Sequence, residues 1–471
     1  MTEQPPAISK AKIGVFALAM LNLAIICTLR GLPIMAEEGL SLVFYFLITA
    51  IIFVIPVSFV CAELATGWPP QGPGGVYIWV YEAFGPKLGF IAIWLQWVQN
   101  VVWFPTMLSF LGATIAYVYD PSLANNKYYM ISVILVSYWG GTILNFKGLK
   151  VSSLVSMICV IVGTVLPGIL IIAFGINWYS SGEPLSITFS FNNLMPDLSN
   201  IRNIVFLAGA VVIMAGIEVS AAHSSDVKNP KSTYPKAIFL ATLISIILLT
   251  LGSLSIAIIV PKNDLSLVGG VMEVFRLFLE AHSLTYLIPT LSVLIFIGAV
   301  GELLAWIIGP AKGLMTTARD GNLPPFLQKV NNKNVPTNIL IVQAVVVTML
   351  SAVFLFMPTV SSSYWILTAL SVILYLIMYF LIFASSIKLR YSRPDVIRSY
   401  TIPGGNPGIW FVAGIGMLGC LFTFVVSFFP PSQISTGSPL FYETFLIVGT
   451  ITMCLIPLIV MHFRKDHWKK I

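Results

Sequence analysis

The chain has little charge: only 9% of its 471 residues are Asp, Glu, Lys or Arg, whereas 58% are apolar. Soluble globular proteins carry about 25% charged residues. This shortage excludes a soluble enzyme or a nucleic-acid-binding protein as the main interpretation. Apolar stretches of roughly twenty residues recur along the chain, each long enough for a hydrocarbon core of about 30 Å. We therefore expect an all-α polytopic membrane protein.

Motifs that carry enzymatic chemistry are also scarce. The five cysteines form no CxxC pair and the four histidines form no HExxH pattern, so no metal site is indicated. We find no GxxxxGK(S/T) phosphate-binding loop and no nucleophile or cofactor motif. The sequence therefore predicts that the protein is not an enzyme and uses no cofactor and no metal.

Twelve apolar segments are expected to span the membrane as helices, because in lipid the backbone polar groups must be satisfied within the segment. They cover residues 13–36, 39–62, 89–118, 129–145, 152–177, 203–222, 236–260, 285–313, 338–358, 363–386, 408–429 and 441–462. The first segment lacks a small-residue cleavage site after a short core, so we expect a retained helix rather than a signal peptide. A short interfacial helix is expected around Val76 to Phe84.

The 25 Lys and Arg residues indicate the orientation. With the N-terminus inside, 20 of them fall on the cytoplasmic side and 4 on the opposite side, and Arg30 lies within a segment. Cytoplasmic loops of membrane proteins carry an excess of Lys and Arg. The net charge of +7 is therefore a topology signal, not evidence for a nucleic-acid partner. We expect a multi-pass protein of a bacterial inner membrane with both termini in the cytoplasm and an oligomeric state that the sequence does not indicate.

Two segments contain helix breakers beside a charge. The first reads Thr28-Leu29-Arg30-Gly31-Leu32-Pro33, and the sixth reads Met214-Ala215-Gly216-Ile217-Glu218-Val219-Ser220. If segments one to five and six to ten are repeats, the two interruptions occupy corresponding positions. This pattern is typical of an inverted-repeat secondary transporter with its site at the membrane midplane. The alternative is a purely structural kink, because Gly and Pro are common in membrane helices.

The expected organisation follows from these repeats. Residues 1–12 form a cytoplasmic tail, 13–200 the first five-helix repeat, 201–390 the second, inverted repeat, 391–463 two further helices, and 464–471 a short cytoplasmic tail.

Broken helices offer free backbone groups to a zwitterion. Free N–H groups at a half-helix N-terminus attract a carboxylate, and free C=O groups at a C-terminus attract an ammonium group. We place the α-carboxylate of a substrate near Gly31, Leu32, Pro33 and Ile34. The α-ammonium group is placed near Ala215, Gly216, Ile217 and Glu218.

Three charges are expected at mid-membrane, namely Arg30, Glu218 and Glu302, and such charges usually face a cavity or a partner. Arg30 has two candidate partners: an acidic substrate, or an internal pair with Glu218 or Glu302. We favour the internal pair, because an unpaired Arg in the empty carrier would be costly.

The remaining candidates each have two interpretations. Glu218 is either a proton-linked carboxylate or latch between the first and sixth segments, or the counter-ion of Arg30. Glu302 and Trp306, spaced i, i+4, lie on one helix face and form either a cavity wall or a buried anchor with a packing Trp. His223 is either a satisfied polar group, the commoner case, or a proton-relay residue that titrates near neutral pH.

Several motifs in order and spacing resemble one family. They are Pro33 to Gly39 leading into Ser41-Leu42-Val43-Phe44, Ala62-Glu63-Leu64-Ala65-Thr66 followed by Gly74-Gly75-Val76-Tyr77, Gly216-Ile217-Glu218-Val219-Ser220-Ala221, Glu302 with Trp306 before Gly309-Pro310, Asn331 with Pro336, Tyr375 with Tyr379, and Ile402-Pro403-Gly404-Gly405. Over essentially the whole membrane region the chain resembles the amino acid–polyamine–organocation superfamily, and most of all the bacterial glutamate/γ-aminobutyrate antiporters.

The resemblance implies a LeuT-type fold of five plus five helices with two added ones. It also implies alternating-access exchange of an amino acid for its decarboxylation product or another amino acid, with a site role for Tyr375 and Tyr379. The expected partners are small amino acids and amines, and the lipid bilayer. Two departures concern substrate and gating: about nine residues follow the last span, too few for the long C-terminal plug of some members, and Arg30 stands where others carry an aromatic residue.

Two rival functions follow from the residues alone. Proton-coupled amino acid uptake without obligate exchange is the alternative within transport. A receptor or channel is less favoured, because the intramembrane charges cluster at the broken helices and the eighth segment instead of forming a filter motif.

Overall fold

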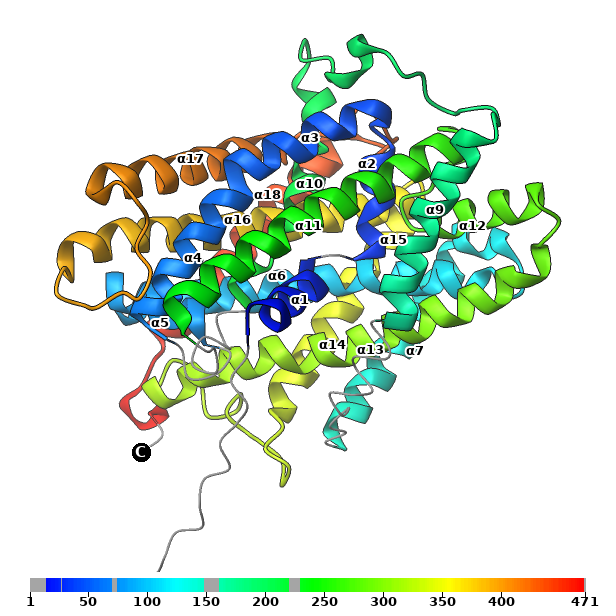
Figure 1. Ribbon diagram of the computed structural model, residues 1–471. Helices are drawn as coiled ribbons and strands as arrows, with labels where there is room; N and C mark the ends of the chain where they lie inside the picture. The colour runs from blue at the N-terminus through cyan, green and yellow to red at the C-terminus, as the bar shows by residue number, and fades with distance from the viewer. Residues whose placement is uncertain (1–13, 27, 70–73, 148–160, 220–228, 470–471) are drawn as a thin grey trace, which may run out of the picture.

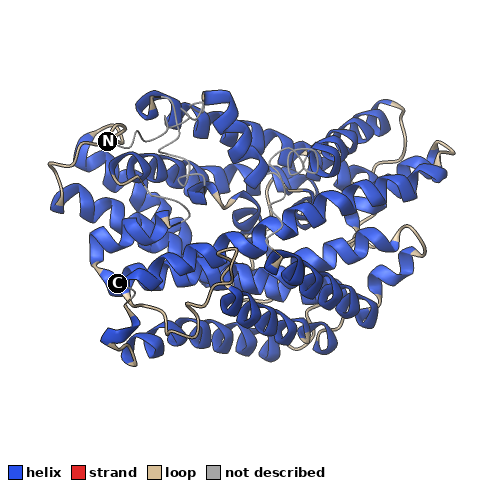
Figure 2. Ribbon diagram, turned by 90° about the horizontal axis from the view of Figure 1, so that it is seen from below, coloured by secondary structure: helices blue, strands red, loops and turns tan. Residues whose placement is uncertain are grey.

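The computed structural model describes residues 14–26, 28–69, 74–147, 161–219 and 229–469. In this part of the chain the regular structure is entirely helical, which confirms the expected fold class (Figure 2). The main helices are α1 (Val15–Ile26), α2 (Leu32–Ala36), α3 (Leu42–Thr49), α4 (Ile55–Gly67), α5 (Gly75–Phe84), α6 (Pro86–Ala116), α7 (Lys127–Phe146), α9 (Leu166–Ser180), α10 (Leu207–Met214), α11 (Pro230–Ile259), α12 (Gly270–Ala281), α13 (Ile288–Met315), α14 (Thr337–Ser351), α15 (Val353–Phe356), α16 (Val360–Ser392), α17 (Gly405–Val426) and α18 (Pro439–His462).

Short helical turns join several of these elements. They are η1 (Leu29–Gly31), η2 (Gly39–Ser41), η3 (Ala50–Val54), η4 (Pro121–Asn125), η5 (Ile161–Val165), η6 (Phe191–Leu194), η7 (Ile201–Ile204), η9 (Thr285–Leu287), η10 (Thr316–Asp320) and η11 (Asp466–Trp468). The turn η3 is π-helical and makes α3 and α4 one continuous segment from Gly39 to Gly67.

Eleven helical segments among the described residues are long and apolar enough to cross a membrane. The first expected span, 13–36, is not one of them, because its helix stops after α1 and resumes at η1. A twelfth span therefore stays a prediction. The fifth expected span, 152–177, lies partly outside the described residues, which resume at Ile161. Other boundaries differ by a few residues, as for α16, which extends the expected 363–386 to Val360–Ser392.

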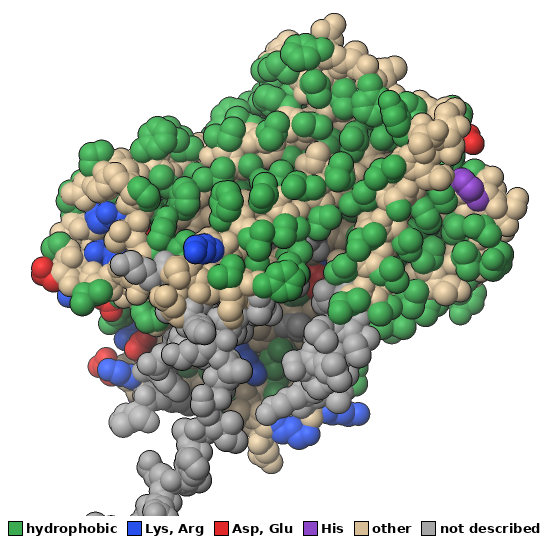
Figure 3. Space-filling model, in the orientation of Figure 1, with side chains coloured by type: hydrophobic (Ala, Val, Ile, Leu, Met, Phe, Trp, Pro, Cys, Tyr) green, Lys and Arg blue, Asp and Glu red, His purple; other side chains and the backbone are tan. Residues whose placement is uncertain are grey.

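Two helices form the centre of the bundle. In α6 94% of the most apolar window is buried inside the protein, and in α16 83%, whereas α18 has only 17% buried and lies at the periphery. Apolar side chains are spread widely over the surface seen in Figure 3, as expected for helices that face lipid. The hydrophobic pattern of the sequence therefore separates into a protein-facing centre and a lipid-facing exterior.

Local sequence explains where several helices begin. The α16 start carries a capping box, in which Thr359 and Ser362 satisfy each other's backbone N–H groups. Asn126 caps α7 through two backbone N–H groups. α11 starts at Pro230, directly after Asn229 in the left-handed conformation.

Two short helices flank the bundle at opposite ends. α5 lies at the left end in Figure 1 and matches the expected interfacial helix, whereas α12 lies at the right end. In both halves of the chain a broken segment is followed by a long helix and then by a short one. The short helix α5 comes after α4, and the short helix α12 comes after α11.

A buried ion-pair cluster closes the α5 end. Glu63, near the end of α4 and 2% exposed, accepts hydrogen bonds from Arg390 and from the backbone N–H of Ile402. Arg398 lies 3.5 Å from the same carboxylate. These contacts of Glu63 tie α4 to α16 and to the loop that follows α16.

The C-terminal tail packs at this same end. Arg464 donates to the carbonyl oxygen of Asp320 at 2.6 Å and to Oδ1 of Asn322 at 3.2 Å. The hydroxyl of Tyr77 on α5 donates to Oδ2 of Asp320 at 2.5 Å. The segment after α13 is therefore joined to α5 and to the C-terminal tail.

Candidate functional site

The first segment breaks at the start of the expected interruption 28–33. Thr28 is extended, with φ −118° and ψ 137°, and the helix resumes at Leu29. The first N–H groups of a helix have no intrahelical acceptor, so the free donors belong to Leu29, Arg30 and Gly31.

The next residues, Leu32 to Ile34, pack against other helices. Leu32 lies against Gly252 of α11, Pro33 against Gly270 of α12, and Ile34 against Gly209 of α10. Leu32, Pro33 and Ile34 are all buried and are not among the residues that line the cavities described below. Gly31 is itself close to α10, since a Cβ atom there would be 2.6 Å from Cγ1 of Ile213.

The second break needs a glycine. α10 ends at Met214, Ala215 is extended with ψ 160°, and Gly216 has φ 115°, a conformation that L side chains rarely adopt. The Gly216 N–H donates to the hydroxyl of Tyr379 at 2.9 Å. The two breaks face each other, because Arg30 from the first and Gly216 from the second line one cavity.

This central cavity has a volume of about 40 Å³. That space holds a few water molecules, so a substrate of amino acid size requires the surrounding helices to move apart. It is lined by Thr28, Arg30, Gln99, Asn100, Trp103, Val212, Ile213, Ala215, Gly216, Trp306 and Tyr375. Of the residues proposed from the sequence, the cavity brings together Arg30, Ala215, Gly216, Trp306 and Tyr375.

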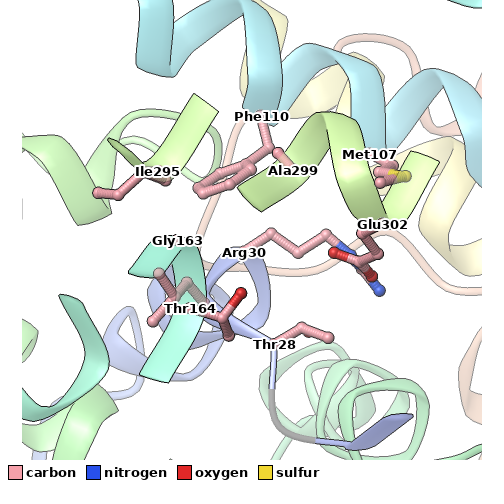
Figure 4. A pocket seen from close by; sticks show the side chains of 10 residues that line it. Thr28, Arg30, Met107, Phe110, Gly163, Thr164, Ile295, Ala299 and Glu302 are labelled. Carbon is pink, nitrogen blue, oxygen red and sulfur yellow. The ribbon is translucent and has the colours of Figure 1, made fainter. Parts of the chain in front are cut away.

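Arg30 forms an ion pair with Glu302. Its Nη1 donates to Oε1 of the carboxylate at 2.7 Å, and the two side chains are 15% and 26% exposed. Figure 4 shows both side chains meeting beside a smaller pocket of about 10 Å³. The Arg30 guanidinium also lies 4.0 Å over the ring of Trp103, which contacts Trp306 at a ring-centroid distance of 5.8 Å. One cation is thus held by a carboxylate and an aromatic face.

Glu218 lies apart from this pair. It is 2% exposed, and its two carboxylate oxygens accept hydrogen bonds from the hydroxyls of Tyr375 and Tyr379, each at 2.5 Å. The amide of Gln96 reaches the first oxygen at 3.5 Å. In the described part of the chain no cation forms an ion pair with Glu218. Of the two internal partners considered for Arg30, the structure therefore shows Glu302.

Tyr379 links the second break to the buried acid. Its hydroxyl accepts from the Gly216 N–H and donates to Glu218, so one hydrogen-bond chain runs from the unwound backbone to the carboxylate. Ile217 is buried beside this chain. His223 lies outside the described residues.

The sequence reasoning missed the contribution of α6. Gln96, Gln99, Asn100 and Trp103 follow one another at spacings of three, one and three, which places them on one helix face. Three amide side chains within an apolar span were the available signal, because polar groups in a membrane helix usually face the bundle interior.

Comparison with known proteins shows which family this chain resembles. A family model described as amino acid permease matches residues 13–452. An uncharacterized transporter of Legionella pneumophila, lpg1691, is 43% identical over 459 residues, which cover 98% of each chain. The glutamate/gamma-aminobutyrate antiporter of Lactococcus lactis strain IL1403 is 30% identical over 467 residues, covering 98% of this chain and 92% of the relative.

A more distant relative also matches over most of the chain. The cadaverine/lysine antiporter of Escherichia coli K12 is 25% identical over 435 residues, covering 89% of this chain and 88% of the relative. Together with the helical membrane architecture and the cavity between two broken segments, these matches show that the chain belongs to the amino acid permease family of membrane transport proteins.

Proposed function

We propose that the protein is a secondary active antiporter that exchanges an amino acid with an acidic side chain for its decarboxylation product by alternating access. One observation carries this proposal: the Arg30 cation lines the central cavity at the first helix break, and its present partner Glu302 belongs to another helix. A carboxylate of a substrate could take the place of Glu302 at the guanidinium.

The chemistry of the site suits such an exchange. Decarboxylation removes the α-carboxylate of glutamate but leaves its side-chain carboxylate. A cation that holds the side-chain carboxylate therefore accepts both molecules, while the free N–H groups of Leu29 to Gly31 meet the α-carboxylate in only one of them. The break at Ala215 and Gly216 exposes carbonyl groups for the ammonium group that both molecules share.

The proposed mechanism rests on two inverted repeats, residues 13–200 and 201–390. The order of elements supports them, since each broken segment is followed by a long helix, a short helix and another long helix. The positions of α5 and α12 at opposite ends of the bundle fit an inverted relationship (Figure 1). With the Lys- and Arg-rich α5 end in the cytoplasm, both termini are cytoplasmic.

Counterflow in proteoliposomes tests the proposal. Vesicles preloaded with unlabelled γ-aminobutyrate should take up labelled glutamate at least about tenfold faster than empty vesicles, the ratio that marks a 1.4 kcal/mol lower barrier. Vesicles preloaded with lysine serve as a control for leakage. Equal uptake into loaded and empty vesicles would contradict exchange.

A second candidate function is proton-coupled uptake without obligate exchange. Glu218 favours it, because a buried carboxylate held by two tyrosine hydroxyls without a cation can carry a proton. A pH gradient should then drive uptake into empty vesicles, and Glu218→Gln should abolish this driving force while binding persists. Glu82→Gln, which makes the same change at a carboxylate outside the cavity lining, is the matched control and should keep this driving force.

A further inference from the structure

A second, larger cavity shares no lining residue with the central one. It has a volume of about 700 Å³ and is bounded by residues that follow α2, by the loop between α9 and α10 and by the loop between α17 and α18. Glu38 adjoins the start of the continuous segment Gly39–Gly67, whereas the Glu63 cluster lies near its end. The two therefore lie at opposite ends of the bundle, and by the distribution of Lys and Arg this cavity faces outward.

One carboxylate in this cavity has no hydrogen-bond or ion-pair partner among the described residues. Glu37 lines the cavity, is 4% exposed and makes no side-chain hydrogen bond or ion pair with any described residue. Its neighbour Glu38, in contrast, accepts from the amide of Gln433 at 2.6 Å and from the hydroxyl of Ser41 at 3.3 Å. Buried polar groups are normally hydrogen-bonded, so the Glu37 carboxylate is a group that a ligand could satisfy.

The charges that face the cavity favour a cation. Three carboxylates line it, those of Glu37, Glu38 and Asp197, against one ammonium group, that of Lys262. With all four ionised the lining carries a net charge of −2. Burial raises the pKa of Glu37 to about 7 and that of Glu38 to about 8, and Lys262 opposes both shifts. Hydrogen bonds from Ser199 hold the pKa of Asp197 below its usual range.

We propose that this cavity binds the primary ammonium group of an amine or an amino acid, with Glu37 as its main counter-ion and Glu38 as the second acceptor. An ammonium group brings three N–H donors, which suit the Glu37 carboxylate and other side-chain oxygens that line the cavity, such as those of Glu38 and Asn192. No cluster of three or more His, Cys, Asp or Glu side chains that could hold a metal ion occurs among the described residues. The site would collect ammonium-bearing molecules at the outer end of the protein.

Binding should displace protons over a defined pH range. A cation that binds the ionised carboxylates lowers their pKa values. Near pH 7, where Glu37 and Glu38 are partly protonated in the free protein, binding therefore releases protons. At about pH 9 both groups are already ionised, so binding should be tighter and release almost none.

Calorimetric titration of the purified full-length protein with propylammonium tests the proposal. This probe has no carboxylate, and titrations in buffers of different ionisation enthalpy count the protons released. Glu37→Gln should weaken binding at least about tenfold and reduce the proton release at pH 7, and Glu38 supplies the release that remains. Glu183→Gln, in the same outer loop but outside the cavity lining, should leave both unchanged.

A second variant separates ligand binding from folding. Lys262→Met removes the opposing cation. At about pH 9, where both carboxylates are ionised, it should tighten propylammonium binding about fivefold, an effect that a damaged fold cannot produce. Titration with alanine then distinguishes the source: Glu37-dependent binding of alanine indicates that amino acids also use the site, and its absence restricts the site to amines.

Three results would overturn the inference. They are unchanged propylammonium binding in Glu37→Gln, weaker binding in Lys262→Met, and equally tight Glu37-dependent binding of tetramethylammonium or Na⁺, neither of which donates a hydrogen bond. The measurement is made at equilibrium without a gradient, so its outcome is independent of whether the protein exchanges substrates.

Discussion

Arg30 and Glu302 are joined by a 2.7 Å ion pair although 272 positions separate them in the chain. Arg30 lies directly after the break of the first segment, and Glu302 lies in the middle of α13. The pair thus connects the broken helix, which offers free backbone donors, to a helix of the opposite half of the chain. A molecule that binds the Arg30 guanidinium in place of Glu302 therefore also breaks the contact between these two helices.

Loss of the Arg30 guanidinium should reduce the transport of acidic substrates more than that of neutral ones. Arg30→Met is expected to lower exchange of glutamate about tenfold or more, because Glu302 is then left without its counter-ion and the substrate without its cation. Exchange is measured in parallel for glutamate and a neutral amino acid. Loss confined to glutamate supports direct recognition by Arg30.

The double variant separates the two roles of Arg30. If the internal pair mainly holds the site together, Arg30→Met combined with Glu302→Gln should recover part of the exchange of neutral substrates, because no unpaired charge remains. Unchanged transport of every substrate by Arg30→Met would remove the residue from the site.

The glycines of the two breaks should not tolerate a side chain. Gly216→Val forces a β-branched residue to φ 115°, and Gly31→Val places a Cβ 2.6 Å from Ile213 Cγ1. Each variant should lose transport while the protein still inserts into the membrane. Gly414→Val is the matched control, since a Cβ there has nothing within 4 Å. Normal transport by both break variants would contradict a site between the broken helices.

Trp306 should affect substrate affinity more than abundance. It lines the central cavity and supports the Trp103 ring under Arg30. Trp306→Ala is expected to raise KM about fivefold, which corresponds to roughly 1 kcal/mol of lost aromatic contact. The exposed Trp410 of α17 provides a control variant, Trp410→Ala. A fall in activity that simply follows the amount of protein would point to a packing role.

The buried Glu63 cluster at the α5 end should contribute to stability. Glu63→Gln leaves Arg390 and Arg398 without their carboxylate and is expected to cost about 3–5 kcal/mol, because all three side chains are largely buried. Glu82→Gln removes the more exposed 3.7 Å pair with Arg393 and should cost no more than about 1 kcal/mol. The midpoint temperature of unfolding in detergent measures both. Equal shifts for the two variants would show that burial does not set the cost.

Much of the architecture could be predicted from local patterns. Apolar runs of membrane length, the Gly-containing breaks at 28–33 and 214–220 and the excess of Lys and Arg at one end are readable from neighbouring residues. The structure confirms the helical class and the position of both breaks. The expected cavity residues Arg30, Gly216 and Trp306 do line one cavity.

Other features of the site depend on contacts between distant segments. The choice of Glu302 rather than Glu218 as the Arg30 partner, the two tyrosine donors on Glu218, and the α6 face of Gln99, Asn100 and Trp103 result from how α6, α13 and α16 pack. Pro33 and Ile34 were expected beside a substrate, but the structure packs them against α12 and α10.

The sequence by itself determined that this protein is a helical membrane protein with two interrupted segments, because hydropathy and helix breaking act over one or two turns and need no knowledge of neighbours. Only the tertiary structure decided that Arg30 pairs with Glu302 and that Glu218 is held by tyrosine hydroxyls instead of a cation. A pairing such as Arg30 with Glu302 depends on helix rotation and on distances of a few ångströms. The same three charges in the same order along the chain are compatible with either pairing.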